Sequence, residues 1–417
     1  VQPPDGNHLE ESGGDGGMKW EKVKLGNVTD SCLGKMLDQN KNKGDYQPYL
    51  ANVNVRWGEF DLEDLPLMKF EESEQERYEL KYGDLVICEG GEPGRCAIWK
   101  EQIPNMKIQK ALHRVRVHDC LDYRYLFYWF LLAGKTGELD QYFTGATIKH
   151  MPGQKLKEVV IDKPPLEIQH RIADILSAYD DLIENNQKQI KLLEEAAQRL
   201  YKEWFVDLRF PGYENTKIVD GVPEGWQYEK LGDLVKTTSG GTPSRRKSEY
   251  YVNGNIRWIK TKELNDRFIF ETEEHITEDA VKNSSAKVLP EGALIVAMYG
   301  ATIGKIGITA AEMACNQACC AFISFDDMIS KEYLYCWLMD NREYLVSQGK
   351  GAAQSNLSQE MIRNFSLLCP DKKVIKNFTE IVTTMLENKR VLENKILMLS
   401  KARDDLLPKL MSGEVEV

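Results

Sequence analysis

The chain has 417 residues, of which 42% are hydrophobic and 29% charged, and it carries a formal net charge of −11 at pH 7. This length allows two to four domains, and the net acidity argues against a uniformly basic coat for nucleic acid. The longest apolar run, Tyr125–Ala133, has nine residues, whereas a membrane span needs about 20. We therefore expect a cytoplasmic protein that does not span a membrane.

The first residues and the cysteines agree with that expectation. Val1–Gly17 is polar, glycine-rich and acidic, so we expect a disordered tail or the remnant of an expression tag before Met18. The nine cysteines form no CxxC pair, and we expect them to be small core residues in a reducing cytosol. Cys315, Cys319 and Cys320 lie close together, but no histidine is near enough in sequence to complete a zinc site.

The sequence contains an internal repeat with a period of about 206 residues. The matches that carry it are Trp20 with Trp226, Gly145-Ala146 with Gly351-Ala352 and Pro164 with Pro370 at a shift of 206, and Gly83–Leu85 with Gly292–Leu294 at a shift of 209. Fixed ends with small insertions between them predict two copies of one domain whose loops have diverged.

Both copies show the same elements in the same order. Short β-type runs between glycines come first, followed by an aromatic-rich helical stretch, a proline, and a long uninterrupted helical pattern. The β-type runs are Leu85–Cys88 and Leu294–Met298, and the aromatic-rich stretches are Tyr123–Leu132 and Lys331–Leu338. In chain order we predict a mixed α/β domain at residues 18–163, a long helix at 164–210, a linker at 211–225, a second mixed α/β domain at 226–369, and a helix with a short tail at 370–417.

The two long helical segments carry an apolar stripe with steps of three and four residues, which is typical of helices that pair along their length. The stripe residues that we expect to face a partner helix are Ile172, Tyr179, Ile190 and Leu193 in the first segment and Phe378, Met385, Ile396 and Leu399 in the second. Net charges of −3 over residues 166–205 and +3 over 371–410 favour pairing of one segment with the other. Pairing of equivalent helices predicts a pseudo-two-fold coiled-coil spacer that joins the two domains.

Three polar or rigid positions in these segments leave open questions. Asn186 and Asn388 interrupt the stripe, and they either fix the register from a buried position or face solvent. Pro408 is expected to end the second helix a little early.

No motif for catalysis or for a bound cofactor is found. Gly300–Lys305 (GATIGK) has three residues between its glycines and an isoleucine after the lysine, whereas a Walker A loop has four residues and a Ser or Thr. Its counterpart Gly90–Arg95 (GGEPGR) also ends in a cation, and both predict a tight hairpin that presents this cation, for example to a phosphate. GxSxG, HExxH and GxGxxG are absent, and the six histidines lack metal-ligand spacing. We therefore predict no catalytic residue and no metal site.

Several stretches resemble the specificity subunits of type I restriction–modification systems. The most specific is Pro164–Gly212 (PPLEIQHRIADILSAYDDLIENNQKQIKLLEEAAQRLYKEWFVDLRFPG), which resembles the central conserved region of that family. The other matching strings are LLPKLMSGE at Leu406–Glu414, YLANVNVRWGEFDL at Tyr49–Leu62, GDLVICEGGEPGR at Gly83–Arg95 and WIKTKEL at Trp258–Leu264. Together they cover essentially residues 18–417.

The resemblance implies a fold and a function. Members have two target-recognition domains of mixed α/β fold joined by two long antiparallel helices. Each domain reads one half of a bipartite DNA sequence, and the helices set the spacer and dock two methyltransferase subunits. The subunit itself is not catalytic: S-adenosylmethionine, ATP and Mg²⁺ are expected on the methyltransferase and restriction subunits. The second copy departs from the pattern, because Asp371 replaces Pro165 and Ile375 replaces Gln169, which we expect to make the two docking surfaces unequal.

Local charge indicates where DNA would bind. Thr242–Lys262 holds six cations and one acid, and the following Glu263–Asp279 holds seven acids and one cation, so we expect a basic face beside an acidic one. The cations predicted to contact DNA are Arg245, Arg246, Lys247, Lys260, Lys262 and Lys305 in the second copy and Arg95, Lys107, Lys110 and Arg114 in the first. Gln109, Asn316 and Gln317 are candidates for reading adenine. For any single one of these residues, a solvated loop or strand edge is an equally good interpretation.

Two other functions stay open at this point. The first is a coiled-coil scaffold whose bodies bind something other than DNA, and it would show no sequence-selective DNA binding. The second is a stand-alone modification enzyme, which would need a methyltransferase or nuclease module upstream, where Val1–Gly17 is too short to supply one. Self-association of the isolated chain through its apolar stripes is also possible.

Overall fold

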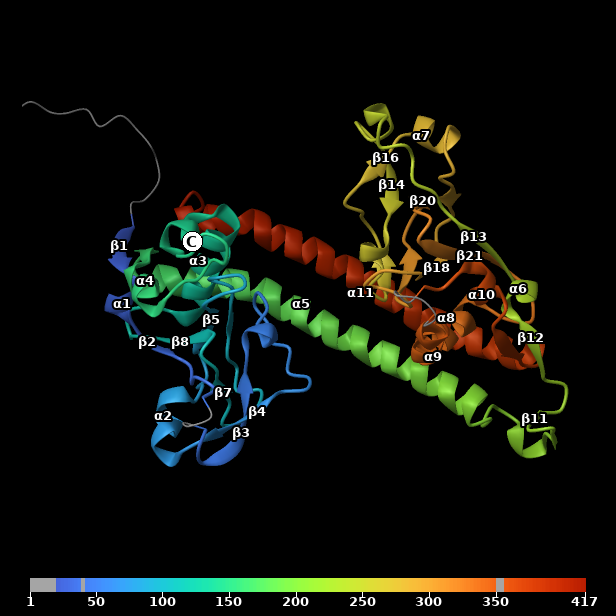
Figure 1. Ribbon diagram of the computed structural model, residues 1–417, viewed down its shortest axis with the longest axis horizontal. Helices are drawn as coiled ribbons and strands as arrows, with labels where there is room; N and C mark the ends of the chain where they lie inside the picture. The colour runs from blue at the N-terminus through green and yellow to red at the C-terminus, as the bar shows by residue number, and fades with distance from the viewer. Residues whose placement is uncertain (1–19, 39–41, 350–355) are drawn as a thin grey trace, which may run out of the picture. The chain divides into compact units, whose positions relative to one another are not determined.

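The computed structural model describes residues 20–38, 42–349 and 356–417. The predicted tail at Val1–Gly17 and the repeat match at Gly351-Ala352 lie outside the described residues. The chain forms two compact units: unit 1 comprises Val1–Leu182 and Leu399–Val417, and unit 2 comprises Ile183–Met398. Each unit contains one mixed α/β body together with part of each long helix (Figure 1).

Unit 1 is built on a four-stranded sheet of order β2-β8-β5-β6, a three-stranded sheet of order β4-β3-β7 and the pair β1-β9. Its strands are β1 (Glu21–Lys24), β2 (Thr29–Leu33), β3 (Asp45–Leu50), β4 (Leu67–Phe70), β5 (Leu85–Cys88), β6 (Cys96–Ile98), β7 (Lys107–Ile108), β8 (Leu112–Val117) and β9 (Val160–Lys163). Its helices are α1 (Leu25–Val28), α2 (Gln75–Tyr78), α3 (Tyr123–Thr136), α4 (Gly153–Glu158) and the start of α5 (Leu166–Tyr201).

Unit 2 contains a five-stranded sheet of order β13-β21-β18-β19-β15, a four-stranded sheet of order β16-β14-β20-β17 and the pairs β12-β22 and β10-β11. Its strands are β10 (Ile218–Val219), β11 (Val222–Pro223), β12 (Gln227–Lys230), β13 (Val235–Ser239), β14 (Ile256–Ile259), β15 (Arg267–Ile269), β16 (His275–Ile276), β17 (Val288–Leu289), β18 (Leu294–Ala297), β19 (Ile306–Thr309), β20 (Met313–Cys315), β21 (Cys319–Phe325) and β22 (Ser366–Cys369). Its helices are α6 (Leu231–Leu234), α7 (Glu278–Lys282), α8 (Lys331–Asp340), α9 (Arg342–Gln348), α10 (Gln359–Arg363) and most of α11 (Lys372–Ser412).

The strand pairing confirms that the chain is a duplication. In unit 1, β1 pairs antiparallel with β9 so that Glu21 lies opposite Lys163; in unit 2, β12 pairs with β22 so that Gln227 lies opposite Cys369. Both pairs of partners are displaced by 206 residues. The predicted fold class, two mixed α/β bodies with long helices, is therefore correct.

Buried strands and one aromatic helix form the core of each unit. All four residues of β5 and all four of β18 are buried. Helix α3 begins where the Asp122 carboxylate accepts hydrogen bonds from the backbone of Arg124 and Tyr125, and it ends at Gly137, whose φ of 77° is a left-handed conformation that favours glycine. Its aromatic residues pack on the sheet and on the start of α5.

Helices α5 and α11 run antiparallel in each unit. In unit 1, Asp180 forms an ion pair with Arg403, and Arg171 donates to the backbone oxygen of Val417 at 3.1 Å. In unit 2, Glu194 lies 2.6 Å from Lys389, and the rings of Trp204 and Phe378 are 5.9 Å apart. Within each unit, residues later in α5 therefore contact residues earlier in α11, as expected for antiparallel helices.

The predicted stripe residues lie in the interior or at its margin. Ile172, Ile190 and Phe378 are buried, and the half-buried members are Tyr179, Leu193, Met385, Ile396 and Leu399. Of the two asparagines, Asn186 is buried whereas Asn388 is exposed.

The helix ends differ from the sequence-based expectations. Helix α5 ends at Tyr201 and continues as one π-helical turn, Lys202–Val206. The expectation that Pro408 ends the second helix early is wrong, because α11 runs through it to Ser412. A proline inside a helix costs about 3 kcal/mol, but the neighbouring Leu407 and Leu410 are fully buried, and each such burial contributes about 1.5–3 kcal/mol.

Gln169, whose replacement by Ile375 in the second copy suggested unequal docking surfaces, is not on a surface. Its side chain is fully buried, accepts a hydrogen bond from the Asp122 backbone at 2.9 Å and donates one to the Pro164 oxygen at 2.8 Å. Ile375 is also buried. The expectation of unequal docking surfaces is therefore wrong for this position, because the difference between the copies is internal.

Candidate nucleic-acid interface

A cation-bearing loop joins β13 to β14 in unit 2, and it is anchored to the sheet beneath it. The Gly241 backbone donates to the Cys315 oxygen at 3.0 Å, and the Trp258 indole donates to the Gly241 oxygen at 3.1 Å. The Tyr251 hydroxyl donates to the Pro243 oxygen at 2.6 Å. These bonds hold both ends of the loop, so the side chains between them project from a fixed backbone.

Arg245, Arg246 and Lys247 are exposed on this loop. The Arg245 guanidinium lies 4.4 Å from the ring centre of Tyr251 and 5.3 Å from that of Trp258, which are cation–π distances. The Lys247 ammonium donates to the Tyr250 hydroxyl at 2.9 Å. Among the described residues, no carboxylate forms an ion pair with Arg246 or Lys247.

Most other cations of this region are paired with carboxylates of the following segment. Arg245 lies 2.6 Å from Glu274, Lys260 contacts Glu273 at 3.0 Å and Glu274 at 2.5 Å, Lys262 contacts Glu273, and Arg257 lies 2.7 Å from Glu271. The ion pair with Arg245, reinforced by Lys260, lowers the pKa of Glu274 to about 2. We call Arg245, Arg257, Lys260, Lys262, Glu271, Glu273 and Glu274 the unit 2 charge network.

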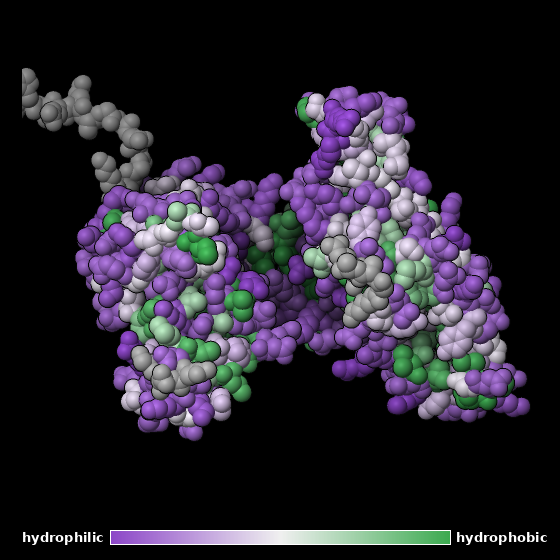
Figure 2. Space-filling model, viewed as in Figure 1, coloured by the Kyte–Doolittle hydropathy of each residue, from purple (hydrophilic) through white to green (hydrophobic). Residues whose placement is uncertain are grey.

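The expectation of a basic face beside a separate acidic face is therefore wrong. Strand β16 pairs antiparallel with β14 and places Arg257 opposite His275, so the two segments interleave. The tip of unit 2 around β14, β16 and α7 is strongly hydrophilic (Figure 2), but its charges largely neutralise one another.

In unit 1, two of the predicted DNA-binding cations are structural. Lys107 is fully buried and its ammonium lies 2.7 Å from Glu79. Arg114 is also buried and donates to the backbone oxygens of Arg77 at 2.9 Å and Glu76 at 3.2 Å. The predictions for these two residues are wrong, because both side chains hold the acidic segment around α2 against the sheet and cannot reach DNA.

Lys110 has a different environment. It is exposed, in the turn between β7 and β8, and we find no carboxylate within ion-pair distance of it in the described part of the chain. It is the member of the predicted set in unit 1 that is both exposed and without such a partner.

The two glycine loops are hairpins, as predicted, but each cation is held inside its own unit. Arg95 follows the turn between β5 and β6 and contacts Glu92 at 3.0 Å and the Asn52 oxygen at 3.1 Å. Lys305 follows the turn between β18 and β19 and lies 2.8 Å from Asp266. Asp266, which also binds Arg342, was not singled out from the sequence. Asp266 adopts a left-handed φ of 67°, and the Asn265-Asp266 dipeptide is a local turn signal in the sequence.

The three candidate amides occupy equivalent turns of the two units. The Gln109 backbone donates to the Leu50 oxygen at 3.1 Å, and the Asn316 backbone donates to the Ile259 oxygen at 2.9 Å. Gln317, next to Asn316, accepts a hydrogen bond from the Thr242 hydroxyl at 2.5 Å. The link between Gln317 and the cation-bearing loop was not predicted from the sequence.

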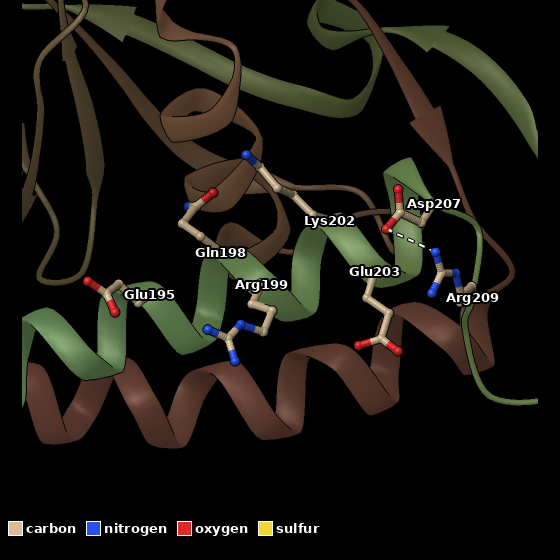
Figure 3. A pocket seen from close by; sticks show the side chains of 7 residues that line it. All are labelled: Glu195, Gln198, Arg199, Lys202, Glu203, Asp207 and Arg209. Carbon is tan, nitrogen blue, oxygen red and sulfur yellow. Dashed lines mark ion pairs between the residues drawn. The ribbon is translucent and has the colours of Figure 1, made fainter.

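An open pocket of about 640 Å³ lies at the C-terminal end of α5 (Figure 3). Its lining residues are Glu195, Gln198, Arg199, Lys202, Glu203, Asp207 and Arg209. Asp207 and Arg209 form an ion pair at 3.8 Å. Because carboxylates and cations are present in equal number, this pocket is not a candidate for binding a polyanion.

Other kinds of site are not seen in the described residues. They contain no group of three or more His, Cys, Asp or Glu side chains that could hold a metal ion. The nine cysteines are free thiols, and most are buried, including Cys315, Cys319 and Cys320. Among the helices in the described ranges, none combines the length and apolar character that crossing a membrane requires.

These features define the class of protein. Two copies of one mixed α/β body, each mounted on the same pair of antiparallel helices, form a duplicated binding protein. Its exposed cations and its candidate amides, of which Gln317 is exposed and Gln109 and Asn316 are half-buried, lie on loops of the bodies. Recognition residues are commonly placed on such loops of a rigid scaffold.

Comparison with known proteins gives the family. The model for the "Type I restriction modification DNA specificity domain" matches twice, at residues 18–195 and 223–398. The MjaIX specificity subunit of Methanocaldococcus jannaschii is 30% identical over 343 residues, which cover 80% of this chain and 78% of that protein. The HindI specificity subunit of Haemophilus influenzae is 24% identical, over 95% of this chain and 99% of that protein.

A solved structure agrees with the assignment at the level of the fold. The specificity subunit from M. genitalium aligns over 95% of this chain and 97% of its own with a TM-score of 0.59, at 15% identity. The chain therefore belongs to the family of type I restriction–modification DNA specificity subunits. It is a recognition subunit rather than an enzyme, and these matches do not favour the alternative of a scaffold without DNA recognition.

Proposed function

We propose that each unit of this specificity subunit binds one half of a bipartite DNA target. The observation that carries the proposal is the duplication, in which two bodies with the same strand pairing, displaced by 206 residues, are mounted on one pair of helices. The loops of the two bodies have diverged while their frames have not. Two bodies with different loops are suited to bind a target whose two halves differ in sequence.

In this proposal, affinity comes from exposed cations that contact phosphates, and selectivity comes from side chains that reach base edges. Arg246 and Lys247 in unit 2 and Lys110 in unit 1 are the candidates for phosphate contacts, because they are exposed and have no ion-pair partner among the described residues. Gln109 and Asn316, at equivalent turns, are candidates for base contacts.

The partners and cofactors follow from the same proposal. Helices α5 and α11 would dock methyltransferase subunits, and restriction subunits would join that complex. S-adenosylmethionine, ATP and Mg²⁺ would be bound by those partner subunits and not by this chain. The complex would act in the cytoplasm, where its target DNA is found.

Co-expression with a methyltransferase subunit of such a system tests the proposal directly. We expect methylated adenines at one bipartite motif across the host genome, and we expect them to disappear when this chain is omitted. Arg246→Ala/Lys247→Ala should reduce methylation, whereas Lys217→Ala, which removes an exposed lysine of the linker between α5 and β10, should leave methylation unchanged.

Domain exchange then assigns the halves. Replacing residues 18–160 by those of a relative should change one half of the motif and leave the other half unchanged, and replacing residues 214–368 should do the reverse. A soluble, verified complex that methylates nothing, or that methylates without sequence preference, would refute the proposal.

A further inference from the structure

The cations at the tip of unit 2 are covered by carboxylates of the same unit. We propose that Glu273 and Glu274 compete with DNA phosphates for Arg245, Lys260 and Lys262, and thereby limit sequence-independent binding of DNA to unit 2. This inference rests on the proposed function, since it assumes that this surface faces DNA. It assigns to the two carboxylates a role in selectivity.

The carboxylates occupy positions that phosphates would take. Glu274 bridges Arg245 at 2.6 Å and Lys260 at 2.5 Å, and Glu273 bridges Lys260 at 3.0 Å and Lys262. Each carboxylate thus joins two cations, as a backbone phosphate does between basic side chains. All three cations are engaged before any DNA arrives.

Arg245 and the backbone that carries Lys260 and Lys262 are also held by contacts other than these carboxylates. Arg245 rests on the rings of Tyr251 and Trp258, at 4.4 and 5.3 Å. The backbone of Lys260 donates to the carboxylate of Glu263 at 2.9 Å, which fixes the start of the turn that also carries Lys262. Neutralising Glu273 and Glu274 should therefore release cations that are carried by a fixed backbone.

The backbone at Glu274 is held by hydrogen bonds that do not depend on the charge of its side chain. The backbone oxygen of Glu274 accepts hydrogen bonds from the Trp258 backbone at 3.0 Å and from the Thr272 hydroxyl at 2.7 Å. Replacing Glu by Gln preserves the size of the side chain and this backbone. The variant therefore changes charge at a site whose fold is set by β14 and its neighbours.

The ion pairs Arg245–Glu274 and Lys262–Glu273 are partly exposed to solvent, so phosphates can displace the carboxylates. The side chains of Arg245, Lys262 and Glu273 are 54%, 52% and 59% exposed, so their ion pairs are screened by water and salt. A phosphate that takes the place of a carboxylate leaves that carboxylate to attract a cation from solution, which offsets part of the counterion release that drives sequence-independent binding. Base contacts made only at the target are not affected by this exchange.

The corresponding strand of unit 1 lacks this arrangement. Strand β4 pairs with β3 as β16 pairs with β14, and the Tyr49 backbone donates to the Pro66 oxygen at 3.1 Å as the Trp258 backbone donates to that of Glu274. The uncharged residues Leu65 and Pro66 therefore stand where unit 2 has Glu273 and Glu274. At this position of the fold, the two bridging carboxylates are therefore a feature of unit 2.

The test measures binding of the methyltransferase-bound subunit to two duplexes, one with its mapped target and one without it, by fluorescence anisotropy at several salt concentrations. For Glu273→Gln/Glu274→Gln we expect about tenfold tighter binding to the duplex without the target at low salt. We also expect the slope of log K against log salt to steepen by about 2, because each additional phosphate contact contributes about 0.9. Binding to the target duplex should tighten less, so the ratio between the two duplexes should fall.

Glu312→Gln/Glu343→Gln is the matched control. Both side chains are exposed in unit 2, neither forms an ion pair with a described residue, and their replacement removes the same two charges. A rise in affinity that is equal in the control variant would overturn the inference and assign the effect to net charge. An unchanged affinity and salt slope in the test variant would overturn it as well.

Two further measurements keep the outcomes distinct. Glu273→Gln alone changes an exposed side chain and should produce about half the increase in slope, so the inference can be judged even if the double variant unfolds. If the wild-type complex shows no preference for its target, the proposed function fails. If it shows that preference and both glutamine variants match wild type, only the further inference fails.

Discussion

Lys389 connects α11 to three other parts of unit 2. Replacing it tests how much these contacts contribute to the stability of that unit. Its ammonium donates to the backbone oxygen of Asp266 at 2.6 Å and to the Tyr335 hydroxyl at 3.2 Å, and it lies 2.6 Å from the carboxylate of Glu194. The side chain is only 2% exposed. Lys389→Met preserves most of the aliphatic volume but removes the charge and all three contacts.

The expected loss follows from the surroundings of the three acceptors. Removing one partner of a buried ion pair costs about 3–5 kcal/mol. Two features place this variant near the lower figure. Glu194 is 31% exposed and can be hydrated. Glu393, which lies 3.8 Å from the Lys389 ammonium and whose pKa burial raises to about 7, can take up a proton. We expect the free energy of unfolding of unit 2 to fall by about 3 kcal/mol, which corresponds to a decrease of about 6–12 °C in Tm for a unit of this size.

Urea unfolding of the full chain, followed by tryptophan fluorescence, measures this loss. The curve should be fitted with two transitions, because the chain has two compact units. Lys395→Met is the matched control, since Lys395 is exposed on the same helix, and it should change the free energy by less than about 0.5 kcal/mol. A loss below about 1 kcal/mol for Lys389→Met, or equal losses for both variants, would refute the reasoning.

Three other predictions concern pH and buried polar contacts. Because burial raises the pKa of Glu393 to about 7 from an ordinary value of 4.5, this group makes unit 2 less stable as pH rises from 4.5 to 7, and Glu393→Gln should flatten the dependence in urea unfolding at pH 5 and pH 8. Lys107→Met should destabilise unit 1 by about 3 kcal/mol, whereas Lys110→Ala should leave stability unchanged and reduce the salt slope of DNA binding by about 1; the reverse pattern would contradict the assignment of these two lysines. Tyr128→Phe removes a 2.6 Å hydrogen bond to Asp180 and should cost unit 1 about 1–2 kcal/mol in thermal unfolding, and no measurable change would show that the bond contributes nothing.

The frame of the molecule could be predicted from the sequence because its signals are local and repeated. A residue-by-residue shift of 206 at both ends of the repeat corresponds to the paired strands at Glu21–Lys24 and Gln227–Lys230. The long helices follow from the three-and-four spacing of apolar residues. The prediction at Pro408 was wrong because the tendency of proline to end a helix is outweighed by burial of the neighbouring leucines. The core in which they are buried cannot be recognised from the local sequence.

The candidate site could be predicted only in part because it depends on pairing between distant residues. Lys107 is a cation in a basic segment, but β7 pairs with β3 and places it in the interior beside Glu79. The residue of β20 that corresponds to Lys107 is Ala314, which lies opposite Trp258 of β14. Comparison of the two copies therefore does not predict that Lys107 is buried. In the same way, the ion pairs of the unit 2 charge network depend on the register of β14 and β16, which a count of charges along the chain does not contain.

The two ion pairs between the long helices explain why one helix selects the other. In both units α5 contributes the acid, Asp180 or Glu194, and α11 contributes the cation, Arg403 or Lys389. A shift of 206 places Ser400 at the position of Glu194 and Ala197 at that of Arg403, so neither helix carries both partners of either pair.

Pairing of two identical helices would therefore leave each of these charges without its partner. In a pair of α5 helices Asp180 would face Ala197, and in a pair of α11 helices Lys389 would face Ser400. Because removing one partner of such a pair costs several kcal/mol when the charge is buried, the arrangement favours α5 with α11 over either helix with its own kind. The opposite net charges of the two segments act in the same direction. Divergence of the duplicated helices has thus made their pairing specific while preserving the stripe on which it is built.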